Sequence, residues 1–343
     1  MSNAMGTPLV SVITPVYNGA DYLAECVESV LAQSYQNWRY CIVNNCSKDD
    51  SLEIARSYAA RDPRISVVDN DEFLNQTDNL NRAMSMTDPE AVWTKMIFAD
   101  DWLFPNCLER MVEAGEARAS IGIVSSYRLD DRSVNCDGLP FPSRFVPGRD
   151  IARASLVDNL YVAGSPSTLL YRSDVVRARQ PFYPSGAWHE DTEIFLEILK
   201  EHDFGFVHEV LSFTRRENES LTTALRQYDP EHRLDKLIVT MKFGPVFLDE
   251  VEFRACRNRE MKAYYDYLGR RCLYSTADGF WEHQHAGLER AGLGLQRGRF
   301  IRHWLAAFVR QLASPGHVLA RLKNRLPDNT APSSTAREKA GEH

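Results

Sequence analysis

The sequence predicts an α/β protein in which a mostly parallel or mixed sheet has helices on both faces and is followed by a helical C-terminal extension. The sheet is predicted because short β-rich runs alternate with segments of helical periodicity over the first hundred residues. One buried run, Met96 to Phe98, leads into two adjacent carboxylates, Asp100 and Asp101. The extension is predicted because helical patterns continue after about Leu221 with few strand signals.

Strand and helix patterns alternate in order through the N-terminal part. The predicted strands are 9–14, 39–44, 65–69 and the buried run before the acid pair, and the predicted helices are 21–33, 49–60 and 76–85. Ser47 and Asp50 have the spacing of a capping box at the start of the second helix. Connections of this kind are right-handed crossovers between parallel strands, so we expect a parallel sheet here.

The alternation is looser in the second half, which predicts that the sheet becomes mixed. Residues 127–149 are polar, rich in Pro and Gly and without periodicity, so we interpret them as an excursion or flap. The other predicted elements are helices at 106–117, 150–160 and 190–201, strands at 121–126, 167–171, 204–208 and 210–214, and an aromatic loop at 181–188.

The predicted organisation has four parts. Residues 1–5 look like a cloning remnant, 6–223 form the α/β domain, 224–327 form the helical extension and 328–343 form a disordered tail. Residues 291–327 hold seven Lys or Arg and no Asp or Glu, with apolar residues at helical spacing from Phe300 to Leu312. Two interpretations stay open: this segment packs on the domain with a solvated basic face, or residues 297–326 contact an anionic membrane.

Composition limits the class of protein and its compartment. Of 343 residues, 44% are hydrophobic and 25% charged, as in ordinary globular proteins. The net charge of −7 argues against a nucleic-acid partner. Seven cysteines without a C-x-x-C pair favour a reduced cytoplasmic compartment and offer no zinc site. We expect no secretory signal and, because no run of 18 apolar residues exists, no spanning helix.

Three turns are expected at the carboxyl edge of the sheet, namely those at 14–18, 44–49 and 100–101, and in a parallel sheet they converge on one crevice. Tyr17 can stack on a base there and Asn45 can hydrogen-bond one. Asp100 and Asp101 repel each other unless a cation or proton lies between them, and a divalent ion that holds substrate phosphates is the usual reason for such a pair. The alternative is a solvated turn with an N-terminal cap. Together these turns predict a nucleotide-diphosphate site without a glycine-rich phosphate loop.

Asp191 is the candidate general base. It lies in Trp188-His189-Glu190-Asp191, at the start of a predicted helix. A carboxylate that faces a crevice can take a proton from an acceptor hydroxyl. The alternative is that Asp191 is a first-turn acid that stabilises the helix.

Five segments resemble family 2 glycosyltransferases, which have the GT-A (Rossmann-like) fold. VSVITPVYNGADYLAECVESVLAQSYQNW resembles their opening and IVNNCSKDDSLEIA their second-strand motif. NLNRAM is similar to their third-helix segment, IFADDWLFPN to their metal motif and WHEDTEIFLEIL to their catalytic segment. The resemblance covers about residues 9–223 in order, which is more specific than any single motif.

The resemblance implies a metal-dependent inverting transfer of a sugar from a nucleotide-diphosphate sugar, with a UDP-sugar favoured. The expected acceptor is a hydroxyl of a glycan or lipid-linked acceptor in cell-surface polysaccharide synthesis. Asp100 and Asp101 would bind Mg²⁺ or Mn²⁺, and Asp191 would be the base. The residues expected to hold the donor are Thr14, Tyr17, Asn18, Asn45, Asn81 and Asp100.

The sequence departs from the family pattern at several positions. Asn44 and Asn45 stand where the family usually has acids, Phe98 where it often has the first acid of the metal motif, and Glu217 where many relatives have His. These departures motivate a second hypothesis, a non-catalytic nucleotide-sugar-binding scaffold. A sugar-phosphate nucleotidyltransferase is disfavoured because the glycine-rich N-terminal loop is missing. Homo-oligomer formation stays open.

Overall fold

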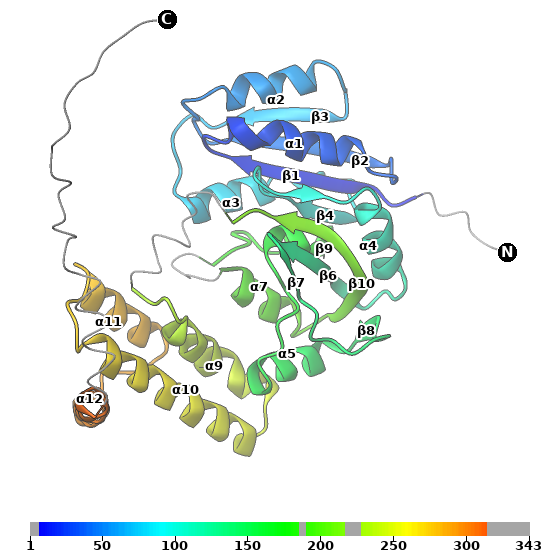
Figure 1. The fold of residues 1–343 in the computed structure, drawn as a ribbon. Coiled ribbons are helices and arrows are strands. Elements are labelled where there is room, and N and C mark those ends of the chain that lie inside the picture. The colour runs from blue at the N-terminus through cyan, green and yellow to red at the C-terminus, as the bar shows by residue number, and fades with distance from the viewer. Residues whose placement is uncertain (1–6, 185–189, 217–227, 314–343) are drawn as a thin grey trace, which may run out of the picture.

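The structure is a computed structural model that describes residues 7–184, 190–216 and 228–313. A ten-stranded sheet forms the centre of the molecule, and a group of helices from the C-terminal part lies at one end (Figure 1). The strand order is β3-β2-β1-β4-β9-β6-β10-β5, with β7 paired to β6 and β8 paired to β10. The predicted α/β class with a mixed sheet is confirmed.

The N-terminal part has the predicted alternation and a parallel sheet. Its elements are β1 (Val10–Val16), α1 (Ala20–Leu31), β2 (Trp38–Asn44), α2 (Ser51–Ala59), β3 (Ile65–Asp69), α3 (Gln76–Met84) and β4 (Trp93–Met96). Strand β1 pairs in parallel with both β2 and β4, and β2 pairs in parallel with β3. All seven residues of β1 are buried, as expected for a β-rich strand covered on both faces.

The predicted capping box at the start of α2 is wrong. The N-cap of α2 is Asp50, whose side chain makes no capping hydrogen bond. The Ser47 hydroxyl instead accepts a hydrogen bond from the backbone N–H of Asn18, 3.0 Å away. Asp49 caps the start of α2 instead, because its carboxylate accepts a hydrogen bond from the backbone N–H of Ser51 at 3.1 Å.

The second half of the sheet is mixed because β9 runs antiparallel to its neighbours β4 and β6, while β6 and β10 are parallel. Its elements are β5 (Trp102–Leu103), α4 (Cys107–Glu116), β6 (Ile121–Asp130), β7 (Ser133–Asn135), β8 (Phe145–Val146), α5 (Gly148–Val157), the 3₁₀ turn η1 (Pro166–Thr168), β9 (Leu170–Arg172), α6 (Ser173–Arg177), α7 (Glu190–Ile198) and β10 (Asp203–Thr214).

Three predictions in this half need correction. The excursion is shorter than expected, because β6 continues to Asp130 and β7 and β8 follow it. The sequence pattern did not reveal the end of β6, because the charged Arg128 occupies a buried position there. Arg128 pairs with Asp130 at 3.2 Å. The two strands expected at 204–208 and 210–214 are one strand, β10, whose register shifts between Val207 and Val210. The strand expected at 167–171 begins as η1.

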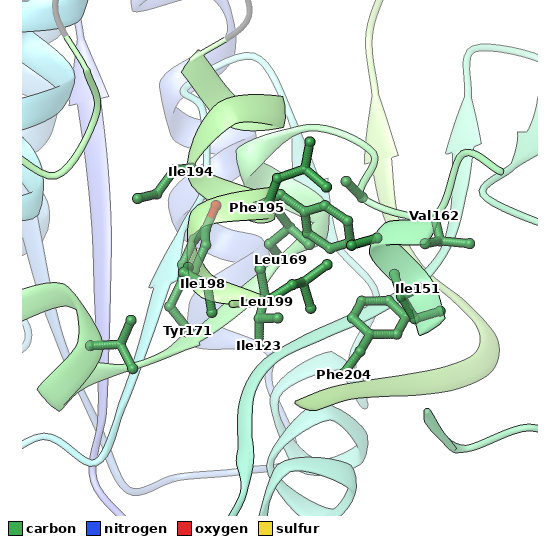
Figure 2. Close-up of a cluster of buried hydrophobic side chains, with 14 of the residues drawn as sticks. Ile123, Ile151, Val162, Leu169, Tyr171, Ile194, Phe195, Ile198, Leu199 and Phe204 are labelled. Atoms are coloured by element: carbon green, nitrogen blue, oxygen red, sulfur yellow. The ribbon is translucent and has the colours of Figure 1, made fainter. Parts of the chain in front are cut away.

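Each face of the sheet packs on its own hydrophobic cluster. One cluster joins α1, α2 and α4 to alternate residues of β1 and β2, such as Val12 and Tyr40. The other joins α3, α5 and α7 to the opposite face. Figure 2 shows this second cluster, in which side chains of α7 such as Phe195 and Ile198 lie against β6, β9 and β10. This packing fixes the N-terminal end of α7 relative to the sheet.

The helical extension consists of α9 (Arg233–Phe247), α10 (Glu250–Arg271), α11 (Phe280–Arg290) and α12 (Arg297–Leu312). It has its own hydrophobic cluster, and Phe243, Phe247 and Cys256 tie it to the cluster around α7. Among the described residues, no helix is long and apolar enough to cross a membrane. The second basic helix and the tail expected beyond residue 313 lie outside the described residues, as does the expected remnant at 1–5.

Candidate active site

The turns that follow β1 and β2 meet at the carboxyl edge of the sheet, as the sequence predicts. Asn18 lies in the left-handed region, with φ of 50°, and its side-chain oxygen accepts from the backbone N–H of Lys48 at 2.8 Å. Together with the Ser47 contact, this hydrogen bond joins the two turns. Asn18 therefore holds the edge of the crevice together, and its side-chain oxygen is engaged in doing so.

Asn45 organises the loop after β3. Its amide donates to the carbonyl of Leu74 at 2.8 Å and accepts from the Leu74 N–H at 2.9 Å and from the Asn70 amide at 3.1 Å. The adjacent Asn44 donates to Asp69 at 2.7 Å, whereas its buried side-chain oxygen has no hydrogen-bond partner among the described residues. The predicted contact of Asn45 with a base stays a prediction.

The loop that Asn45 holds presents an aromatic pair at the crevice. Tyr17 follows β1 and Phe73 lies in the loop before α3, and their ring centroids are 4.9 Å apart. The two side chains are 44% and 59% exposed. Two exposed aromatic rings at this edge of the sheet can hold a base by stacking. Tyr17 was predicted for this role and Phe73 was missed, although an aromatic residue in the polar stretch DNDEF was a usable signal.

Thr14 does not face the crevice with its side chain. Its hydroxyl lies in the core and is 2.8 Å from the hydroxyl of Tyr40, and the Cys26 thiol is 3.9 Å away. Burial raises the pKa of Cys26 to about 12, so the thiol stays protonated. The predicted role of Thr14 in holding the base therefore has no support from its side-chain contacts.

The acid pair follows β4, where the backbone turns at Phe98 to Asp101. Asp101 is buried, and its carboxylate accepts from the backbone N–H of Arg215 at 3.3 Å. Burial raises the pKa of Asp101 to about 7, the charge of Asp100 adds to the rise, and hydrogen bonds from Ser167 and Arg215 oppose it. A cation beside this pair would favour the charged form of Asp101.

The pair has the donor chemistry of a Mg²⁺ or Mn²⁺ site. Both side chains offer carboxylate oxygens, which are the ligands that hard divalent ions prefer. Among residues 7–184, 190–216 and 228–313, no cluster of three or more His, Cys, Asp or Glu side chains could hold a metal alone. Such an ion would therefore take its remaining ligands from a diphosphate and water, as Mg²⁺ commonly does.

A buried lysine fixes the loop around the acid pair. The Lys95 ammonium is fully buried in β4 and donates to the carbonyls of Ser167 at 2.7 Å and Leu169 at 3.2 Å. The Ser167 hydroxyl in turn accepts from the backbone N–H of Phe98 at 3.0 Å. Phe98, which replaces an expected acid, thus takes part in this support through its backbone.

Two arginines flank the pair. The guanidinium of Arg215 lies over Tyr22 and Trp102 and donates to the backbone carbonyl of Asp100 at 3.4 Å. Arg216 pairs with Asp130, and this hydrogen bond raises the pKa of Arg216 against the opposing effect of burial, with smaller contributions from the charges of Asp130 and Asp101. Glu217, which follows these arginines and departs from the family pattern, lies outside the described residues.

Asp191 lies in the first turn of α7 and lines a cavity of about 650 Å³. Its carboxylate accepts from the backbone N–H of Thr192 at 2.7 Å. The ring of Tyr161, which is 50% exposed, lines the same cavity, and its hydroxyl donates to the carbonyl of Gly164 at 2.9 Å. Residues 185–189, which include Trp188 and His189 of the segment that carries Asp191, lie outside the described residues.

The cavity lies between the α/β domain and the extension. Its α/β side includes Phe98, Arg128 and Arg216, close to the acid pair. Its other side comes from α9 and α10 and includes Lys236 and Glu260. The cavity that Asp191 lines thus reaches Phe98, two residues before the acid pair, and this proximity suits a reaction between two bound substrates.

Asn81 supports the lining of this cavity, because its hydrogen-bond partner Tyr183 is one of the lining residues. Its amide donates to the carbonyl of Tyr183 at 2.9 Å and accepts from the Tyr183 N–H at 2.7 Å. Asn81 therefore fixes the position of the segment that leads to α7. Its predicted contact with the donor stays a prediction.

Comparisons with known proteins agree with this geometry. Residues 11–176 match the family model for glycosyl transferase family 2. TuaG of Bacillus subtilis, a putative teichuronic acid biosynthesis glycosyltransferase, is 27% identical over 217 residues, which are 63% of this chain and 82% of TuaG. The uncharacterized protein y4gI of Sinorhizobium fredii is 35% identical over 129 residues, which are 37% of this chain and only 14% of that relative.

Solved structures share the fold. S. aureus TarS 1–349 in complex with UDP-GlcNAc superposes with a TM-score of 0.63 over 87% of this chain and 89% of TarS, at 14% identity. Mannosyltransferase PcManGT of Pyrobaculum calidifontis, in complex with GDP-Man and Mn²⁺, superposes with a TM-score of 0.53 over 90% of this chain and 88% of its own, at 15% identity. The GT-A fold expected from the sequence motifs is confirmed.

Proposed function

The chain belongs to glycosyl transferase family 2 through residues 11–176, and from this premise we propose that it transfers a sugar, with inversion, from a nucleotide-diphosphate donor to an acceptor hydroxyl. One observation carries the proposal. The buried Asp101 and its neighbour Asp100 lie at the carboxyl edge of the sheet, and the cavity that Asp191 lines reaches Phe98, beside the pair. A displacement at the anomeric carbon needs these two centres, one for the leaving diphosphate and one for the acceptor proton.

The donor half of the site would hold the nucleotide diphosphate. Asp100 and Asp101 would hold Mg²⁺ or Mn²⁺, and the bound ion would supply Lewis-acid neutralisation of the leaving diphosphate. Arg215 adds a cationic side chain at the same edge. Support for a divalent ion comes from the family and from the Mn²⁺ bound to the similarly folded PcManGT.

The acceptor half would hold the hydroxyl that receives the sugar. Asp191 would take its proton, since its carboxylate lines the cavity. The half-exposed ring of Tyr161 offers a flat apolar face for a sugar, and the extension supplies the opposite wall. We propose a glycan or lipid-linked acceptor in cell-surface polysaccharide synthesis, in the cytoplasm, and the name of the relative TuaG supports that class.

Calorimetric titration with nucleotides is the experiment that tests the proposal. UDP, GDP, dTDP and CMP are each titrated into the protein with Mn²⁺ and with a chelator. We expect one nucleoside diphosphate to bind tightly only with metal, and we favour UDP, as bound to the similarly folded TarS. Absence of binding by folded protein would favour the second hypothesis, a scaffold disabled by Asn44, Asn45 and Phe98.

We expect Phe73→Ala to weaken binding of the preferred nucleotide about tenfold, because stacking of one base on an aromatic ring contributes about 1–3 kcal/mol. The measurement is the same titration with Mn²⁺ present. Phe141→Ala is the matched control, since Phe141 is 77% exposed and its ring contacts His208 of β10. Unchanged affinity in Phe73→Ala would show that the pair of Tyr17 and Phe73 does not hold the base.

A further inference from the structure

Helix α12 has one broad apolar face, and only one side of it is packed. On that side Phe300 packs on the cluster of the extension, the Trp304 indole donates to the Cys272 carbonyl at 3.4 Å, and Ala307 is 8% exposed. The apolar residues on the other side are exposed, although the Phe308 ring stacks on that of Trp304. They are Ile301, Leu305, Phe308, Val309 and Leu312, with exposed fractions between 42% and 65%. The apolar stripe expected from the sequence is therefore wider than its contact with the extension.

Exposed apolar side chains are concentrated on this side of α12. Five of the fourteen exposed large hydrophobic side chains in the described residues lie on this one helix. At 100° per residue, Ile301, Leu305, Phe308 and Leu312 form one continuous strip along the helix. Single exposed apolar residues are normal, whereas a contiguous strip marks a surface that binds something.

The charges around the strip indicate what it binds. Arg302 lies at one edge of the strip on the helical wheel and Arg297 at the other, and Arg299 and Arg310 lie farther round. The sequence from 291 to 327 holds seven Lys or Arg and no acid, although the whole chain has a net charge of −7. An apolar strip bordered by arginines matches an anionic lipid surface, where the apolar side chains enter the acyl boundary and the arginines meet the head groups.

Two other occupants fit less well. A second copy of the same face would bring the arginines of the two helices together without any acid from α12 to pair them. The described part of the extension packs on the neighbouring side of α12 and leaves this strip exposed. Figure 1 shows α12 at the edge of the molecule, on the side of α10 that is remote from the sheet.

We propose that α12 lies in the surface of an anionic membrane through Ile301, Leu305, Phe308, Val309 and Leu312, with Arg297 and Arg302 at the head groups. This inference goes beyond the proposed function and does not depend on it. The membrane contact is peripheral, since the helix has only 16 residues and the other side of its apolar face is packed.

The full-length protein is sedimented with vesicles of phosphatidylcholine, or of phosphatidylcholine mixed with phosphatidylglycerol, without nucleotide or acceptor. We expect binding only to the anionic vesicles and a marked loss at high salt, because the arginines are screened. The triple variant Leu305→Gln/Phe308→Gln/Leu312→Gln should bind at least about tenfold more weakly.

The matched control is Val246→Gln/Val251→Gln/Tyr274→Gln, which changes three equally exposed apolar residues elsewhere in the extension and should bind as the wild type does. Both variants are first checked for an unchanged thermal midpoint. The proposal would be overturned if the wild-type protein did not bind anionic vesicles, or if the triple variant of α12 bound them as well as the wild type does. A wild-type dimer that the α12 variant converts to a monomer would assign the face to a second copy instead.

Discussion

An Asp191→Asn variant should bind the nucleotide donor as the wild type does and lose sugar transfer by about 10²- to 10⁴-fold, the usual contribution of a general base. The amide has the shape of the carboxylate, and its oxygen can still accept from the Thr192 N–H, so α7 should keep its start. It cannot take a proton from an acceptor hydroxyl. Donor affinity should be unchanged, because Asp191 lies at the α7 end of the cavity while the acid pair follows β4. Release of the nucleoside diphosphate with a panel of sugar acceptors measures transfer.

The neighbouring carboxylate provides the control for this prediction. Glu190 lines the same cavity, but it accepts a hydrogen bond from the Thr77 hydroxyl of α3, which gives it a structural task. Glu190→Gln should therefore keep transfer within about tenfold of the wild type. Full activity in Asp191→Asn together with a large loss in Glu190→Gln would mean that the base is Glu190.

Local patterns in the sequence were enough to predict the order of elements and the position of the acid pair. Strand β3 was predicted with its observed bounds, because Ile65–Asp69 is a short β-rich run whose limits are set by its neighbours in the chain. The strand after Tyr127 was missed, since its charged Arg128 is buried only because Asp130 and Asn135 compensate it. Periodicity of apolar residues cannot reveal a strand whose buried positions are polar.

The roles of the polar site residues depended on distant partners. The amide of Asn45 is engaged by Leu74, 29 residues away, and that of Asn81 by Tyr183, 102 residues away. A motif shows that such an amide belongs near a site, but its hydrogen-bond partners come from the tertiary fold. The same holds for Thr14, whose hydroxyl meets Tyr40 in the core. The sequence could place these residues near the crevice and could not say which way their side chains point.

An Asp101→Asn variant should lose metal-dependent donor binding and gain stability. A buried carboxylate next to Asp100 costs folding free energy when charged, and burial with that neighbour raises the pKa of Asp101 to about 7. In an unfolded chain the pKa is near 3.8, so the folded protein binds the extra proton between about pH 4 and pH 7. Stability therefore falls as pH rises through this window, and the penalty is largest above pH 7.

The neutral amide removes that penalty. A shift of about three pKa units corresponds to as much as about 4 kcal/mol, so Asp101→Asn should melt several degrees above the wild type at pH 8 and close to it at pH 4. Asp130→Asn is the opposite control. Although burial alone raises the pKa of Asp130, pairing with Arg216 and Arg128 lowers it below its ordinary value, so removal of that charge should destabilise the protein at neutral pH.

The same substitution should remove the dependence of nucleotide affinity on Mn²⁺, because one of the two carboxylates that would hold the ion is gone. Titration of the preferred nucleotide with and without Mn²⁺ measures this loss, and thermal melting at pH 4 and pH 8 measures the gain. Stability should rise while ligand binding falls, because the buried charge that the ligand needs destabilises the folded protein. A variant that melts below the wild type at pH 8 would show that the hydrogen bonds to Thr214 and Arg215 outweigh the buried charge, and that Asp101 is mainly structural.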